Sequence, residues 1–192
     1  DRAVALLHEA GVPRSVLQFL PGDGAIGARL VAHPSIAGVV FTGSTEVARS
    51  INRALADRLR PDGGVPVLIA ETGGQNALVA DSSCLPEQLV LDAVISAFDS
   101  AGQRCSALRL LCLQEDVADR VVPMLEGAMA ELCVGNPDRL AVDVGPVIGE
   151  DAQRSLQQHV ERLRAAGHRV FQVPIDPVAT GRGTFVAPTL IE

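Results

Sequence analysis

One cysteine stands apart from the rest of the chain because of the residues around it. Cys105 lies in the segment Gly102–Arg109, a polar loop in which Arg104 and Arg109 are close in sequence to the thiol. Neighbouring cations favour the thiolate, which is the nucleophilic form of cysteine. A free cysteine is, however, more often a buried residue without reactivity. The loop therefore offers two alternatives, a catalytic nucleophile or an inert core residue.

A carboxylate occupies a second suggestive position. Glu71 follows the apolar run 65–70 and precedes Thr72, Gly73 and Gly74. Paired glycines at the end of a strand suit a sharp bend or a close approach of the backbone to a ligand. A carboxylate beside such a bend can act as a general base. The alternative is an ordinary acid in the turn that ends a strand.

Two glycine-containing segments are candidate phosphate-binding turns. Gly22–Gly27 matches G-x-G-x-x-G between a predicted strand and a predicted helix, the context of a dinucleotide fingerprint. The next predicted strand ends without the acid that holds a ribose hydroxyl, so a plain glycine-rich turn is the alternative. In Phe41–Thr45, either Ser44 or Thr45 can cap the following helix, whose free N–H groups attract phosphate. Simple capping is the alternative there.

The remaining cysteines and the histidines show no pattern of metal ligands. No two cysteines form a C-x-x-C pair, so neither a zinc site nor a thioredoxin-type motif is expected. The histidines lack ligand spacing as well. We expect the cysteines at positions 84, 112 and 133 to be core residues with reduced thiols, as in a cytoplasmic protein.

Apolar and β-branched runs alternate with helical patterns, which predicts an α/β fold that positions these residues. A turn is expected at 61–64, where proline, aspartate and two glycines follow one another. The predicted helices are 4–10, 24–31, 45–60, 86–100, 117–132 and 151–166. The predicted strands are 16–20, 38–41, 65–70, 76–80, 109–113, 170–173 and 185–191.

Composition excludes several classes of protein. The 192 residues contain 16 basic residues, all of them arginine, so a Schiff-base lysine and a P-loop are absent from this stretch. A net charge of −7 and the lack of Trp and Tyr argue against nucleic-acid binding. No apolar run reaches the length of a transmembrane segment. The first residues already read as a helix, so we expect the chain to be a piece cut from a longer protein.

The order of the motifs carries a resemblance. Phe41–Thr45, then Glu71–Gly74, then Gly102–Cys105 resembles the aldehyde dehydrogenase superfamily, and segments 134–137 and 144–148 match two further landmarks of that family. In detail, residues 71–76 and 98–109 are most similar to the L-glutamate γ-semialdehyde (1-pyrroline-5-carboxylate) dehydrogenase half of the bifunctional proline utilization A enzymes. The resemblance spans essentially the whole chain.

The resemblance implies a role for each motif. Cys105 would be the nucleophile that forms a thiohemiacetal and then a thioester, Glu71 would activate the water that hydrolyses the thioester, and the N–H of Cys105 would donate to the oxyanion. Ser106 would help to hold the substrate. The family does not use the ordinary dinucleotide fingerprint, which accounts for the missing acid. Contacts with the NAD cofactor would come from Gly24, Thr42, Gly43, Ser44, Thr72 and Gly73.

The resemblance also implies the organisation of the chain. Residues 1–72 would be the later half of an NAD-binding domain, and residues 73–192 the first part of the catalytic domain. Other family parts would lie outside the chain, so we expect the parent protein, a homo-oligomer acting on a small aldehyde, to be active and the fragment alone to be inactive. FAD would belong only to a proline dehydrogenase domain elsewhere. A non-catalytic truncated module, or an enzyme for another aldehyde, is the alternative.

Overall fold

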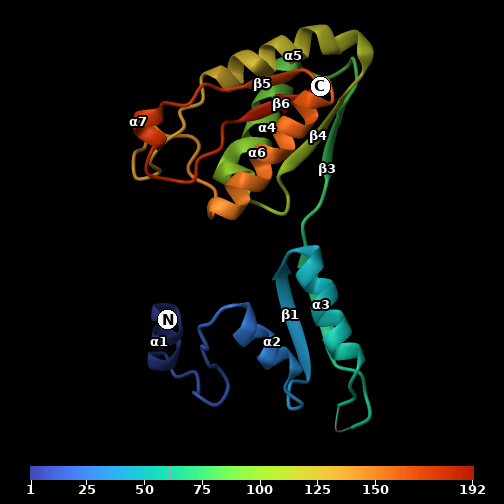
Figure 1. Cartoon of the computed structure of the whole chain (residues 1–192), viewed down its shortest axis with the longest axis vertical. Coiled ribbons are helices and arrows are strands. Elements are labelled where there is room, and N and C mark those ends of the chain that lie inside the picture. Colours follow the sequence, from blue (N-terminus) through green and yellow to red (C-terminus); the bar gives the residue numbers. More distant parts are fainter. Residues whose placement is uncertain (61) are drawn as a thin grey trace. The chain divides into compact units, whose positions relative to one another are not determined.

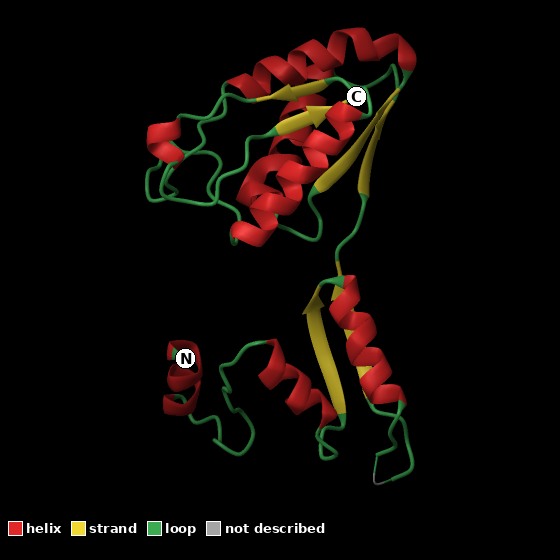
Figure 2. Cartoon of the chain, viewed as in Figure 1, coloured by secondary structure: helices red, strands yellow, loops and turns green. Residues whose placement is uncertain are grey.

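The computed structural model describes residues 1–60 and 62–192, and this part of the chain divides between Thr72 and Gly73 into two units. Each unit combines helices with strands, as Figure 2 shows by colour, so the predicted α/β class is confirmed. The predicted turn at 61–64 falls partly on Pro61, which lies outside the described residues. No helix among the described residues is long and apolar enough to cross a membrane.

Unit 1 (residues 1–72) is built around two parallel strands joined by a helix (Figure 1). Strands β1 (Gly38–Gly43) and β2 (Val67–Thr72) pair along their whole length, and α3 (Thr45–Ala56) forms the crossover between them. The helix packs against both strands and buries Ala48 and Leu55. Two shorter helices precede this core, α1 (Arg2–Glu9) and α2 (Gly24–Ala32).

The face of β1 and β2 opposite α3 has no cover among the described residues. Val40 pairs with Ile69, and the two side chains are 79% and 53% exposed. Two residues further on, Thr42 pairs with Glu71. Because side chains alternate along a strand, all four lie on the same face of the pair. The Glu71 carboxylate therefore extends from the uncovered face of the pair.

The predicted strand at 16–20 is wrong. These residues form no strand ladder with any described segment, and Val16, Phe19 and Leu20 are all exposed. An isolated strand is not stable, because its backbone groups need partners on a neighbouring strand. Unit 1 consequently has one pair of strands in place of the two strand–helix units and closing strand that we expected.

Unit 2 (residues 73–192) contains a second parallel pair, β3 (Asn76–Ala80) with β4 (Leu108–Leu113), and an antiparallel pair, β5 (Val170–Gln172) with β6 (Thr189–Ile191). Helices α4 and α5 pack against each other, and Figure 1 shows α6 beside β5 and β6. A short 3₁₀ segment, η1 (Asp99–Gly102), follows α4 directly. The helices are α4 (Pro86–Phe98), α5 (Glu115–Ala130), α6 (Glu150–Ala165) and α7 (Pro177–Thr180).

The main core of unit 2 lies between its helices and strands. Its fully buried side chains include Val121 and Met129 of α5. Cys84 packs against this core, but Cys112 and Cys133 are exposed, so the expected burial of these two cysteines is wrong. Cys112 alternates with Leu111 and Leu113 along β4 and occupies the outer face. The predicted strand at 185–191 shrinks to β6, and α7 was not predicted.

Candidate active site

Cys105 lies at the corner of a tight turn between η1 and β4. The N–H of Ala107 donates to the carbonyl of Arg104 at 3.1 Å, which makes Cys105 and Ser106 the two central residues of a β-turn. Both central residues are exposed. Within residues 1–60 and 62–192, no group accepts the backbone N–H of Cys105. The turn therefore directs a thiol and a free N–H to the outside.

The side chain of Asn76, the first residue of β3, stabilises this turn. The side-chain amide nitrogen of Asn76 donates to the carbonyl oxygens of Cys105, at 2.8 Å, and of Ala107, at 2.9 Å. The two acceptors lie on either side of Ser106. A polar side chain thus begins a strand that continues as the apolar sequence 77–80. The sequence shows an asparagine directly before an apolar strand, but its contact with the Cys105 turn follows only from the fold.

A second amide side chain anchors the chain on the N-terminal side of Cys105. Gln103 accepts a hydrogen bond from the N–H of Ile148 at 2.7 Å through its Oε1 atom. Its Nε2 atom donates to the carbonyls of Ser100, at 3.1 Å, and Pro146, at 3.3 Å. The family landmark at 144–148 is therefore tied to the residue two positions before Cys105. The sequence gives no spacing that would have indicated this contact.

The backbone that leads into the turn is left-handed. Ser100 and Ala101 have φ values of 57° and 54°, and Gly102 follows at 67°. Residues with a Cβ are disfavoured by about 1–2 kcal/mol in this region. At Gly102, a Cβ atom would also lie 2.7 Å from the carbonyl oxygen of Ala97. Residues 100–102 thus reverse the direction of the chain after α4 at a conformational cost, and only glycine fits the last position.

The two arginines near Cys105 do not bond to its thiol. Arg104 donates to the carbonyl of Ile95 at 3.3 Å and lies 3.5 Å from the Asp99 carboxylate. Arg109 donates to the carbonyls of Gly102 and Leu108. Both guanidinium groups therefore satisfy backbone and acidic groups at the end of α4 and around η1. They stabilise the loop itself. Among the described residues, neither arginine forms a hydrogen bond with the Cys105 thiol, so no bond supports the expectation that these cations favour the thiolate.

The candidate cofactor residues of unit 1 gather at the carboxyl ends of its strands. Thr42 pairs with Glu71 and Gly43 with Thr72, so four of the predicted residues lie on two neighbouring strand ends. Ser44 follows at once and caps α3, because its Oγ accepts the N–H of Val47 at 3.3 Å. Strand ends of a parallel sheet beside a helix N-terminus are where dinucleotide phosphates bind in α/β proteins.

An acidic residue occupies the same helix end. Glu46 stands in the first turn of α3, and its pKa is lowered because its own backbone N–H and then the Ser44 hydroxyl bond to the carboxylate. A carboxylate at a helix N-terminus is favourable for the same reason as a phosphate. A phosphate at this helix end would therefore lie beside an acidic side chain.

The segment that matches G-x-G-x-x-G is a capped helix start without a preceding strand. Asp23 accepts the N–H groups of Ala25, at 3.0 Å, and Ile26, at 3.2 Å, and α2 begins at Gly24. The first donors of this helix are thus already satisfied by an acid. The structure agrees with the plain glycine-rich turn, and the contact of Gly24 with a cofactor stays a prediction.

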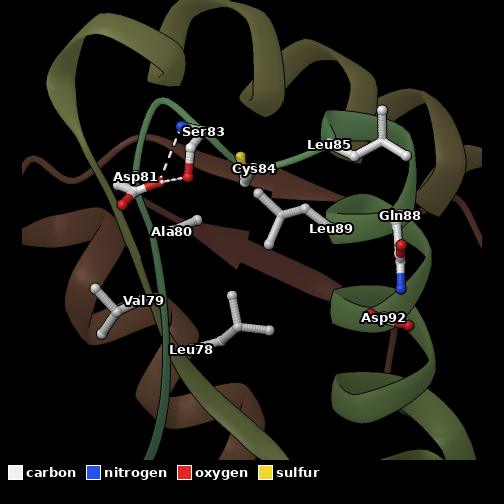
Figure 3. A pocket seen from close by; sticks show the side chains of 10 residues that line it. All are labelled: Leu78, Val79, Ala80, Asp81, Ser83, Cys84, Leu85, Gln88, Leu89 and Asp92. Carbon is white, nitrogen blue, oxygen red and sulfur yellow. Dashed lines mark hydrogen bonds between the residues drawn. The ribbon is translucent and has the colours of Figure 1, made fainter.

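A hollow of about 400 Å³ lies in unit 2 beside the end of β3 and the start of α4, away from the Cys105 turn. Figure 3 shows Asp81 and Ser83 at one end of it and Asp92 at the other. Asp81 accepts the Ser83 hydroxyl at 2.6 Å and its N–H at 2.9 Å, and these bonds lower the pKa of Asp81. No residue that we predicted for catalysis or cofactor binding lines this hollow.

The structure thus brings the predicted residues together in two separate groups. Thr42, Gly43, Ser44, Glu71 and Thr72 share the strand ends of unit 1. Cys105 and Ser106 share a turn of unit 2, whose first residue is Gly73. Sequence reasoning missed Asn76 as a partner of the Cys105 turn, and it noted Gln103 only as part of a motif.

Comparison with known proteins gives a consistent assignment. A sequence model of the aldehyde dehydrogenase family matches residues 2–192. The chain is 54% identical over 196 residues to the bifunctional protein PutA of Klebsiella aerogenes, and 34% identical over 188 residues to the 1-pyrroline-5-carboxylate dehydrogenase of Geobacillus kaustophilus. It resembles the crystal structure of 1-pyrroline-5-carboxylate dehydrogenase from Thermus with bound NAD, with a TM-score of 0.86 and 32% identity.

The matches cover nearly all of this chain but a small part of each relative. The aligned region is 100% of this chain and 15% of the Klebsiella protein, and 97% of this chain and 36% of the Geobacillus protein. For the Thermus structure it is 99% of this chain and 36% of that chain. Since the family model extends over residues 2–192, the chain belongs to the aldehyde dehydrogenase family.

Proposed function

We propose that the protein to which this chain belongs oxidises L-glutamate γ-semialdehyde to L-glutamate with NAD. The observation that carries the proposal is the exposed Cys105 at the corner of a turn whose N–H is free among the described residues. The substrate is supported by the similarity to PutA and to 1-pyrroline-5-carboxylate dehydrogenases, since 1-pyrroline-5-carboxylate is the cyclised form of this semialdehyde. NAD is supported by the cofactor of the Thermus relative.

The first step uses the turn that carries Cys105. The thiolate sulfur of Cys105 forms a bond to the aldehyde carbon, and the electron pair of the C=O bond moves onto oxygen to give a tetrahedral thiohemiacetal anion. The backbone N–H of Cys105 donates a hydrogen bond to this oxyanion. Removing one such donor typically costs about 3 kcal/mol of transition-state stabilisation. Ser106, the other central residue of the turn, is exposed like Cys105 and contributes to holding the substrate.

The second step oxidises the carbon that is bound to sulfur. When bound, NAD supplies the acceptor for the hydride that leaves this carbon, so the substrate loses two electrons. The electron pair on the oxyanion re-forms the C=O bond, and Cys105 is left as a thioester. The N–H of Cys105 donates to this oxygen both in the anion and in the thioester.

The third step releases the acid. Glu71 takes a proton from a water molecule, whose oxygen adds to the thioester carbon. The C–S bond then breaks, the sulfur leaves as thiolate, and L-glutamate departs with its second carboxylate. The exposed position of Glu71 on the uncovered face of β1 and β2 supports this role, since a general base for water must be reachable by solvent.

The residues of unit 1 fit a dinucleotide by their chemistry. Thr42, Gly43 and Ser44 are exposed, and they form the junction of a parallel strand with the N-terminus of a 12-residue helix. Such a junction provides N–H groups and a favourable dipole for a pyrophosphate. We therefore assign unit 1 to the later half of an NAD-binding domain and unit 2 to the first part of the catalytic domain. Gly24, Thr72 and Gly73 complete the proposed cofactor contacts.

The test follows NADH formation by stopped flow in the full-length protein, with the semialdehyde as substrate. Cys105→Ala should abolish both the initial burst and the steady state, because no thioester can form. Glu71→Gln should keep the burst and slow the steady state by about 10²–10⁴-fold, the usual contribution of a general base. A Cys105→Ala enzyme with normal turnover would refute the nucleophile.

Substrate choice needs its own measurement. The rate on the semialdehyde should exceed the rates on simple aliphatic aldehydes of similar length, compared as kcat/KM. Equal values would show an aldehyde dehydrogenase of another specificity. No NADH from any aldehyde would favour a non-catalytic module, and the proposed function would be wrong.

A further inference from the structure

We propose that Asn76 is a positioning residue for the nucleophile, because its side-chain amide fixes the turn that carries Cys105. The proposal rests on the function proposed above, which makes this turn the site of reaction. Asn76 touches neither the thiol nor the Cys105 N–H, so it acts through the backbone alone.

The amide of Asn76 uses both of its hydrogens on this turn. Its Nδ2 atom lies 2.8 Å from the carbonyl oxygen of Cys105 and 2.9 Å from that of Ala107. These partners are 29 and 31 positions further along the chain. The opposite orientation of the amide would turn its oxygen, which cannot donate, toward two other acceptors. The chemistry of the two carbonyls therefore requires a side chain with two donors at this position.

One backbone bond and one bond from Asn76 fix the two peptide planes that flank Cys105. The carbonyl of Arg104 accepts the N–H of Ala107 at 3.1 Å, and the carbonyl of Cys105 accepts from Asn76. A trans peptide is planar, with its N–H opposite its C=O. Holding the Arg104 carbonyl toward the inside of the turn therefore directs the Cys105 N–H outward. With the second plane held as well, the direction of the Cα–Cβ bond of Cys105 is determined.

Asn76 holds the second of these planes directly, and by binding the Ala107 carbonyl it supports the turn whose own bond directs the Cys105 N–H. Geometry matters steeply here, since a misplacement of about 1 Å can cost about 10²-fold in rate. Gln103 cannot replace Asn76, because its bonds go to Ser100, Pro146 and Ile148 and none of them reaches the peptide plane that follows Cys105.

The experiment uses Asn76→Asp and Asn76→Ala in the full-length protein. Asp keeps the size of the side chain but replaces two donors by a carboxylate, and Ala removes the contact. Asn52→Asp is the matched control, because Asn52 is an exposed asparagine of α3 for which the described chain shows no side-chain hydrogen bond. Hydrogen exchange by mass spectrometry reports the turn through peptides that cover residues 104–108, and stopped flow reports the burst of NADH.

We expect both Asn76 variants to exchange the Ala107 amide at least tenfold faster, with exchange in α4 and α5 unchanged. The burst rate should fall about 10–100-fold, while the Kd for NAD stays within twofold of the wild type. Asn52→Asp should change neither. Exchange and burst rates within twofold of the wild type in both variants would overturn the proposal.

Three further outcomes remain decisive. Faster exchange throughout unit 2 would mean that Asn76 stabilises the fold in general, and the positioning role would be wrong. If these variants do not fold, Asn76→Ser, which retains one donor, takes their place and should give an intermediate loss in both measurements. If the wild type forms no NADH from any aldehyde, the proposed function fails, but the exchange of residues 104–108 still shows whether Asn76 holds the turn.

Discussion

Two turns of this chain carry most of the candidate chemistry, and they are built in opposite ways. At the junction of β1 with α3 the helix start is capped locally, since Ser44 accepts the N–H of Val47 three positions later. The Cys105 turn between η1 and β4 is held from a distance. Asn76 reaches it from 29 positions away, and Gln103 binds Ile148 from 45 positions away.

The difference shows how each site tolerates change. A local cap forms as soon as its few residues adopt their preferred dihedral angles, and its loss affects one helix end. A turn held by distant partners forms only when the surrounding unit has folded, and the loss of any one partner changes the conformation of the turn. The left-handed residues 100–102 add to this dependence, because the folded surroundings must compensate their conformational cost.

The largest expected effect comes from Gly102→Ala. The left-handed φ and the close approach to the Ala97 carbonyl should together destabilise the protein by about 2–4 kcal/mol in urea unfolding. The control is Gly127→Ala in α5, where an added Cβ meets no atom within 4 Å. That change should stabilise the protein by about 0.5–1 kcal/mol, because alanine favours a helix. Similar effects of the two changes would contradict the strained turn.

Gln103→Ala should have the next largest effect. It removes the link to segment 144–148, and because the Ile148 N–H is exposed and water can replace the lost acceptor, the cost should be about 0.5–1.5 kcal/mol. Thermal unfolding of the variant measures this loss. Gln157→Ala, on the exposed face of α6, should stay within about 0.5 kcal/mol of the wild type. If both glutamine variants melt like the wild type, the distant anchor contributes nothing.

Ser44→Ala tests the locally built turn. Loss of the N-cap should cost about 1 kcal/mol in urea unfolding. Ser50→Ala, at an exposed position inside the same helix, should be neutral or slightly stabilising, since alanine has the higher helix propensity. A Ser44 variant as stable as the Ser50 variant would show that the cap is not what holds this junction.

The smallest expected effect is a pH dependence at the same junction. Glu46 has a pKa below its ordinary value of 4.5, because its own N–H and the Ser44 hydroxyl bond to the charged form. A lowered pKa in the folded state means that these bonds stabilise the protein above pH 4.5 and are lost as the pH falls through the lower, folded value. In an NMR titration, Ser44→Ala should raise the pKa of Glu46 toward 4.5. An unshifted titration would exclude the contribution of the hydroxyl.

The same contrast explains what could be predicted from the sequence. The α/β class and the resemblance to aldehyde dehydrogenases are confirmed, because both depend on local patterns and on the order of short motifs. The cap of α3 was placed at Ser44 or Thr45 for the same reason, and the structure shows Ser44. The contacts of Asn76 and Gln103 depend on which distant segments fold together, and no spacing within a motif indicates that.

The errors have a physical cause of the same kind. Residues 16–20 have the composition of a strand but no partner strand in the described chain. Cys112 has the apolar neighbours of a core residue, but it alternates onto the exposed face of β4. In both cases the local composition fits the prediction, but strand pairing and burial depend on which element lies alongside.

The parallel register of β1 and β2 has a consequence for insertions and deletions. Glu71 pairs with Thr42, and both extend from the face opposite α3. Because side chains alternate, deleting a single residue of β2 before Glu71, with the pairing at Gly38 and Val67 retained, would move the carboxylate to the α3 side. A change that removes no functional residue would then inactivate the proposed base. Deleting two residues would return the carboxylate to the uncovered face, two positions earlier along β1.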